Sequence, residues 1–130
     1  MRLRRVIRAQ WDVLAVCTPR GECPLRELLG DLPANLAADG RSMLRLFSFI
    51  AEQGPPRNVE VSHKIMGEIW ELIAGRLRVL WFYGEGRSVV CSHGFVKRTK
   101  KTPPIETYRA QAAANEYQIA MKRRDLRIEG

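Results

Sequence analysis

The strongest pattern for a sheet lies in residues 68–96, EIWELIAGRLRVLWFYGEGRSVVCSHGFV. It contains three runs rich in apolar, β-branched and aromatic residues, at 68–74, 77–83 and 88–96, and short segments with glycine separate them. Such runs are typical of strands, and glycine suits the turns of hairpins. Connections of so few residues allow consecutive strands to pair only in the antiparallel sense. The stretch therefore predicts a three-stranded antiparallel meander.

The segments before the meander predict one strand and two helices. Residues 9–17, AQWDVLAVC, place apolar side chains at every second position, as a strand would. Residues 23–33, CPLRELLGDLP, predict a short helix with Pro24 near its start. A longer helix is expected from Ala34, with Gly40 as a candidate break and Gly54 as its end. Its apolar face comprises Leu36, Met43, Leu44, Phe47, Ile50 and Ala51.

A final helix is expected after the meander. Pro103 and Pro104 suit a first helical turn, Thr102 is the expected cap, and Glu106 lies where the helix dipole favours an acid. We expect an apolar stripe on this helix to pack against the sheet; its members are Ile105, Tyr108, Ala112 and Ile119.

The order of these elements predicts an α+β fold. We expect a small antiparallel sheet, mixed at its N-terminal strand, with two N-terminal helices and one C-terminal helix. A chain of 130 residues fits one domain, 1–130. No sequence run approaches the roughly 20 apolar residues that a membrane span needs. The apolar part of the opening MRLRRVIRAQWDVLAV is interrupted by Gln10 and Asp12, so we predict a soluble, cytoplasmic protein without membrane attachment.

The composition indicates a folded, basic protein. Hydrophobic residues make up 45% and charged residues 28% of the chain, and the formal net charge is +8. Such a surface favours polyanions, which include nucleic acid, acidic proteins and anionic lipids. The three cysteines and two histidines lack the spacing of metal ligands. We therefore expect no disulfide framework, no metal and no cofactor.

A cluster of cations follows the last strand of the meander. HGFVKRTKKTPP, residues 93–104, contains four basic residues within five positions, and residues 86–105 contain no acid. Arg76 and Arg78 should share one face of the middle strand, and His93 should share a face of the next strand with Lys97. Antiparallel pairing can bring these two sets together, although the register is open. The alternative to an anion-binding site is a basic loop that is simply solvated.

Three motifs carry a family resemblance. WEL at 70–72, RLRVLWFY at 76–83 and FVKRTKKTP at 95–103 resemble, in this order, toxins of the RelE/ParE superfamily, and the HigB-type, phage-related branch is the most similar. GECPLRELLGDLP at 21–33 resembles the first helical segment of the family, so the likeness covers most of the chain and implies a RelE-like fold. Ile73 is a departure, because the branch usually has an arginine there.

The resemblance implies a metal-independent endoribonuclease that cleaves mRNA, often on the ribosome, and inhibits translation. It also implies a helix-turn-helix antitoxin that holds the toxin inactive. In that reaction a ribose 2′-hydroxyl attacks the adjacent phosphate, and fixed cations stabilise the charge that develops. The matching positions suggest Arg78 and Lys97 as phosphate stabilisers, with Arg98 assisting. His93 would transfer protons, Glu71 would act as a base or orient Arg78, and the RNA backbone would be followed by Arg76, Lys100 and Lys101.

Other interpretations stay open at this point. A ParE-like inhibitor of DNA gyrase would bind its target without cleaving RNA, and a plain nucleic-acid-binding module would show strong salt dependence without toxicity. His93 could be a hydrogen-bonded histidine of the core, and Glu71 with Arg78 could be a structural cross-strand ion pair. We expect the aromatic residues of the meander to pack in the core and sheet rather than stack on bases; they are Trp70, Trp81, Phe82 and Tyr83.

Overall fold

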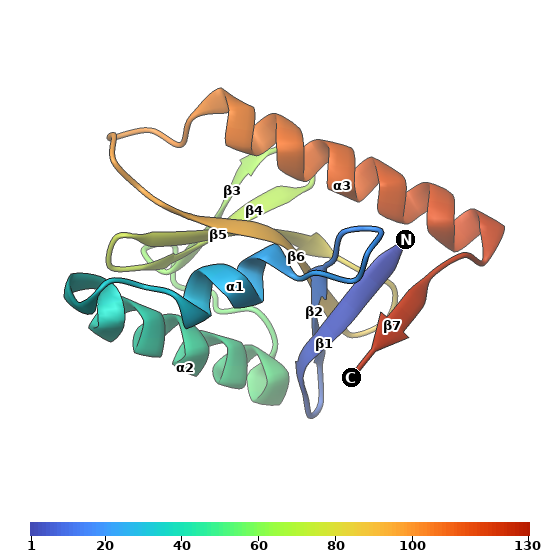
Figure 1. Ribbon diagram of the computed structural model, residues 1–130, viewed down its shortest axis with the longest axis horizontal. Coiled ribbons are helices and arrows are strands. Elements are labelled where there is room, and N and C mark those ends of the chain that lie inside the picture. The colour runs from blue at the N-terminus through green and yellow to red at the C-terminus, as the bar shows by residue number, and fades with distance from the viewer.

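A seven-stranded sheet with strand order β3-β4-β5-β6-β2-β1-β7 forms the centre of the computed structural model, which describes residues 1–130. In chain order the elements are β1 (Arg2–Arg8), β2 (Asp12–Val16), α1 (Pro24–Gly30), the 3₁₀ turn η1 (Ala34–Leu36), α2 (Ala37–Gln53), β3 (Ser62–Met66), β4 (Ile69–Ala74), β5 (Leu77–Tyr83), β6 (Ser88–Val96), α3 (Pro104–Arg123) and β7 (Arg127–Glu129). Helices α1 and α2 cover one face of the sheet, and α3 crosses the other face (Figure 1).

The predicted meander is confirmed. Strands β4, β5 and β6 pair antiparallel, and Glu71, Leu80 and His93 occupy one row across them. Only Gly75 and Arg76 connect β4 to β5, and Gly75 has a φ of +59°, which glycine adopts without strain.

The α+β class is also confirmed, but the expected small sheet with two N-terminal helices does not match in detail. Strand β2 pairs parallel with β6, so the sheet is mixed there. Three further strands enlarge it, and one of them, β1, precedes the helices together with β2. Strands β1, β3 and β7 lie towards the sheet edges, are short or rich in charge, and lack the apolar alternation that identifies a strand.

Two apolar layers hold the helices to the sheet. Met43, Phe47 and Ile50 of α2 pack against the strands on one side, as expected, whereas Leu44 is exposed. Gly40 does not break α2; it is buried within the helix, where a Cβ would lie 2.6 Å from Leu32 Cδ1. The glycine therefore permits close packing.

Helix α3 packs on a different face from the one the sequence predicted. All four residues of the expected stripe are exposed, led by Ile105 at 73%. The buried residues are Ala110, Ala114, Tyr117 and Ala120. Alanine lets the helix lie close to the sheet, while the ring of Tyr117 lies 5.6 Å from that of Phe82 and its hydroxyl accepts a hydrogen bond from the Glu85 N–H. None of the helices could cross a membrane.

Candidate functional site

A basic hollow lies where β5 begins and β6 ends. It has a volume of about 510 Å³ and is lined by seven residues, of which five are cations and none is acidic. The lining residues are Gly75, Arg76, Arg78, Lys97, Arg98, Thr99 and Lys100. The structure therefore brings together five of the predicted site residues, and we call this site the basic hollow.

The β4–β5 turn places Arg76 in this site. The Lys97 N–H donates a 2.8 Å hydrogen bond to the Arg76 carbonyl, so the residue just after β6 lies beside the residue just before β5. The Arg76 N–H in turn donates to Asp39 Oδ2 of α2 at 2.9 Å. A Cβ at Gly75 would overlap the Asp39 carboxylate. Asp39 thus fixes the turn, and it was missed from sequence because it lies 37 positions before Arg76.

Arg78 is held rigidly at the base of the basic hollow. Its residue exposure is only 9%, and Nη1 donates to the carbonyls of Gly75 at 2.7 Å and Leu77 at 2.9 Å. Its Nε is buried without a hydrogen-bond partner and lies 3.8 Å from Glu71 Oε1. A charged side chain with this fixation has little rotamer freedom left to lose when an anion binds.

Glu71 connects Arg78 with the loop that precedes α3. It is 2% exposed, and its Oε2 accepts a hydrogen bond from the Thr102 hydroxyl. His63 Nε2 lies 3.5 Å from the other carboxylate oxygen. Thr102 was expected to cap α3, but α3 has no side-chain cap. Thr102 instead ties the segment between β6 and α3, residues 97–103, to the sheet, and we call this segment the basic loop. The distance of 3.8 Å between Glu71 and Arg78 is that of an ion pair rather than a hydrogen bond.

His93 lies outside the basic hollow, beneath the start of α3. Its exposure is 1%; Nδ1 is 2.9 Å from Ser92 Oγ and Nε2 is 3.1 Å from Glu106 Oε1. An ionised carboxylate only accepts, so Nε2 carries the proton towards Glu106, and Nδ1 accepts from the Ser92 hydroxyl. Burial and, next, the charge of Arg109 lower the pKa of His93, while Glu106 opposes this shift. The observed burial matches a histidine of the core.

A bulge at Ser92 corrects the predicted pattern of β6. The register shifts between Leu80 and Trp81, so that His93 faces α3 while Cys91 packs in the layer beneath α2. Strict alternation would have placed both on one face. The three cysteines are buried free thiols, and burial raises the pKa of Cys91 to about 12.

Two further positions noted from sequence are Lys101 and Ile73, and neither adds a cation to the basic hollow. Lys101 is exposed but does not line the basic hollow. Ile73 pairs with Arg78 across β4 and β5 and is half-buried, so no cation projects from the position where the branch usually has arginine. Arg76, three residues later, supplies a cation to the same site.

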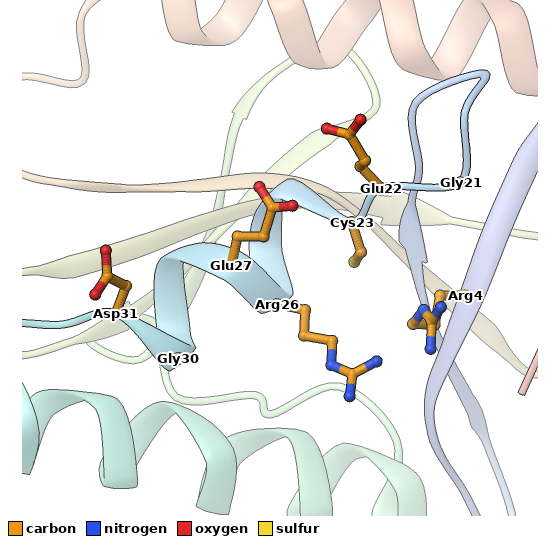
Figure 2. A pocket seen from close by; sticks show the side chains of 8 residues that line it. All are labelled: Arg4, Gly21, Glu22, Cys23, Arg26, Glu27, Gly30 and Asp31. Carbon is orange, nitrogen blue, oxygen red and sulfur yellow. The ribbon is translucent and has the colours of Figure 1, made fainter.

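A larger hollow of about 700 Å³ lies beside α1 and has a different charge. Figure 2 shows its two guanidinium groups, from Arg4 and Arg26, and its three carboxylates, from Glu22, Glu27 and Asp31. The lining therefore sums to one net negative charge, against five positive charges in the basic hollow. A polyanion is better matched by the smaller site. No group of three or more His, Cys, Asp or Glu side chains is arranged to hold a metal ion.

Comparison with known proteins identifies a family. Residues 27–115, more than half of the chain, match the family described as phage-derived protein Gp49-like (DUF891). No curated protein matches the chain. The matched segment contains β4, β5, β6 and the basic loop.

Proposed function

The chain belongs to the phage-derived Gp49-like family, a family of the RelE/HigB-type toxin group, and on this premise we propose that it is an endoribonuclease that cleaves mRNA to inhibit translation. The observation that carries the proposal is the basic hollow, in which four further cations and no acid line the site of a buried, fixed arginine, Arg78. An RNA phosphate is the anion that this charge distribution suits.

The reaction that we propose is attack of a ribose 2′-oxygen on its neighbouring phosphorus. The 2′-oxygen loses its proton and forms the new P–O bond, while the bond to the 5′-oxygen of the next nucleotide breaks and that oxygen gains a proton. The products are a 2′,3′-cyclic phosphate and a 5′-hydroxyl. Negative charge grows on the phosphoryl oxygens at the pentacoordinate stage, and preorganised cations stabilise it most where they need not reorganise.

The structure supports distinct roles for the cations. Arg78, held by backbone carbonyls, and Lys97, on the adjoining strand end, are proposed to stabilise the phosphate, with Arg98 assisting. Arg76 and Lys100 of the basic hollow, with the exposed Lys101 beside it, are proposed to follow the RNA backbone without reading sequence.

Glu71 and His93 are proposed as positioning residues. Glu71 lies behind Arg78 and accepts from Thr102, so it holds both the arginine and the basic loop. His93 bonds Glu106 at the start of α3, and its buried ring offers no contact to a substrate in the basic hollow. For His93 we therefore propose a role in holding the N-terminal turn of α3, in place of the proton transfer that the sequence led us to expect.

The proposal includes a partner. A toxin of this group works with an antitoxin, and we propose a helix-turn-helix antitoxin that covers the basic hollow with an acidic or apolar segment. The charge of the site favours an acidic one.

Induced expression tests the proposal. Wild type should arrest growth and create new mRNA 5′ ends, whereas Lys97→Ala should do neither at equal protein level. Lys122→Ala, an exposed cation at the far end of α3, is the control and should behave as wild type. Growth arrest with DNA damage and no new RNA ends would replace the proposal by a gyrase inhibitor, and no arrest at all would leave a basic binding module.

A further inference from the structure

A third cavity, of about 580 Å³, lies at the other end of β5 from the basic hollow. It is bounded by the segment after α2 and by β3, β4 and β5. Arg78 and Tyr83 are five positions apart on β5, a separation of roughly 17 Å along a strand. Because five is odd, their side chains also leave opposite faces of the sheet. This aromatic cavity is therefore a separate place on the molecule.

Four aromatic side chains line the aromatic cavity. They include all three tryptophans of the chain, Trp11, Trp70 and Trp81, together with Tyr83. The centroid of the Tyr83 ring lies 6.3, 6.1 and 4.9 Å from the rings of Trp11, Trp70 and Trp81. Trp81 is fully buried, as expected from sequence, but Tyr83 is 47% exposed. The neighbouring rings are inclined to Tyr83, so the exposed Tyr83 ring is the surface on which a planar ring can stack.

Two buried polar groups of the aromatic cavity lack partners. Only four buried side-chain polar atoms in the chain make no hydrogen bond, and two of them, Trp81 Nε1 and Ser62 Oγ, belong to residues that line this cavity. A buried polar group without a partner costs about 1–3 kcal/mol. The indole N–H can only donate, whereas the hydroxyl can donate or accept. A planar ligand whose hydrogen-bonding edge reaches these two atoms would give both of them a partner.

The lining also attracts negative charge. Arg57, His63 and Lys64 line the aromatic cavity, and no aspartate or glutamate does. Lys64 Nζ lies 5.6 Å from the centre of the Trp70 ring, so the ammonium group stands at the edge of the aromatic cluster. A ligand that stacks on Tyr83 can therefore place an anionic group beside Arg57 and Lys64.

We propose that the aromatic cavity binds a nucleotide unit, with its base against Tyr83, its edge towards Trp81 Nε1 and Ser62 Oγ, and its phosphate beside Arg57 and Lys64. A nucleobase combines the required planarity with acceptors and donors at its edge, and base stacking on aromatic side chains is a general mode of nucleotide binding. The unit is either a free nucleotide or part of an RNA strand. The inference does not rest on RNA cleavage.

Tryptophan fluorescence tests this proposal directly, because every tryptophan of the chain lies at the aromatic cavity. Titration with AMP, GMP, CMP and UMP, corrected for absorption, should give saturable quenching by at least one of them in the millimolar range or below. Ribose 5-phosphate, which lacks the base, should give none. A short RNA of the best base that binds at least tenfold more tightly than the mononucleotide identifies an RNA unit, and equal affinity identifies a free nucleotide.

Variants separate this site from the basic hollow. Tyr83→Ala should weaken binding at least tenfold, and Lys64→Ala should weaken it several-fold. Ser62→Ala should also weaken binding without lowering protein stability, because its hydroxyl has no partner to lose. Lys97→Ala, at the basic hollow, should bind mononucleotides as wild type does. Absence of saturable quenching by all four mononucleotides at about 10 mM, or unchanged affinity in Tyr83→Ala, overturns the proposal.

Discussion

Lys97 and Arg78 contribute to the basic hollow in different ways. Arg78 is buried and bound to two backbone carbonyls, so replacing it removes structural contacts as well as a charge. The Lys97 side chain is half-buried at the end of β6, and no hydrogen bond or ion pair of the fold depends on it. Lys97 is therefore the cleaner position at which to test chemistry.

Replacing Lys97 by alanine should lower the rate of RNA cleavage by about 10²–10³-fold, because the proposed mechanism then loses a positive charge beside the phosphate that gains negative charge. Thermal unfolding should be unchanged. Single-turnover cleavage of a defined RNA is the measurement. Lys101→Ala removes a nearby exposed cation that does not line the basic hollow and should reduce the rate less than tenfold. Equal losses in both variants would contradict a specific role for Lys97.

His93 should make the protein less stable as the pH falls below about 6.5. Its pKa is lowered in the folded state by burial and by Arg109, so below the ordinary value of 6.5 the unfolded chain binds more protons. The stability that the neutral His93 contributes is fully present above pH 6.5, and it is lost as the pH falls towards the lower pKa of the folded state. Glu106, which faces the ring, moderates the effect.

Urea unfolding at pH 7.5 and 5.5 measures this contribution. The loss in the free energy of unfolding between these pH values should be smaller for His93→Gln than for wild type, by up to about 1 kcal/mol. Glutamine keeps a donor for Glu106 but does not titrate. An identical pH dependence of the two proteins would show that His93 does not titrate in this range.

The elements that the sequence predicts well are those with local signals. Each strand of the meander carries its own apolar run, and glycine marks each turn, so β4, β5 and β6 were found together with the cations at their ends. The cations meet because antiparallel pairing leaves few arrangements. The outer strands β3 and β7, and β1 next to β7, carry no such pattern, since their identity depends on the neighbours with which they pair.

For helix α3, hydrophobicity alone does not predict which face packs against the sheet. The sequence offers large apolar residues on one face and alanines on another, and hydrophobicity alone selects the wrong one. The observed face is chosen by shape, because alanines allow the close approach that Ile105 or Tyr108 would prevent. The bulge at Ser92 and the contact of Asp39 with the β4–β5 turn likewise depend on tertiary structure and have no local signal.

The β4–β5 turn should respond to substitution at Gly75 more strongly than an ordinary turn. Alanine there meets both a positive φ and the Asp39 carboxylate, whereas at Gly86, with a φ of +68°, a Cβ meets no atom within 4 Å. Gly75→Ala should lower the free energy of unfolding by about 1–3 kcal/mol more than Gly86→Ala. It should also displace Arg76 and reduce cleavage. Equal losses of stability in the two variants would mean that the Asp39 side chain can move away from the new methyl group without destabilising the fold.

The whole protein has a net charge of +8, and five of its 22 lysine and arginine side chains line the basic hollow without an acid. We expect three to five of these cations to contact phosphates of single-stranded RNA. The logarithm of the association constant should then fall with the logarithm of the salt concentration, with a slope of about −2 to −3.5. Binding of a non-cleavable RNA at several salt concentrations measures the slope. Arg98→Ala should reduce its magnitude by about 0.7. A slope near zero would exclude phosphate contacts as the basis of binding.

RNA cleavage at the basic hollow is best tested with an mRNA that carries a single 2′-deoxy nucleotide at the mapped cut. The purified protein is given this RNA, and its unmodified counterpart, both on translating ribosomes and free in solution. We predict that the unmodified RNA yields a 2′,3′-cyclic phosphate and a 5′-hydroxyl, and that the 2′-deoxy substitution abolishes this cut, since the attacking oxygen is missing. Cleavage that persists at the deoxy position, or a 5′-phosphate at the new end, would contradict the mechanism proposed for the basic hollow.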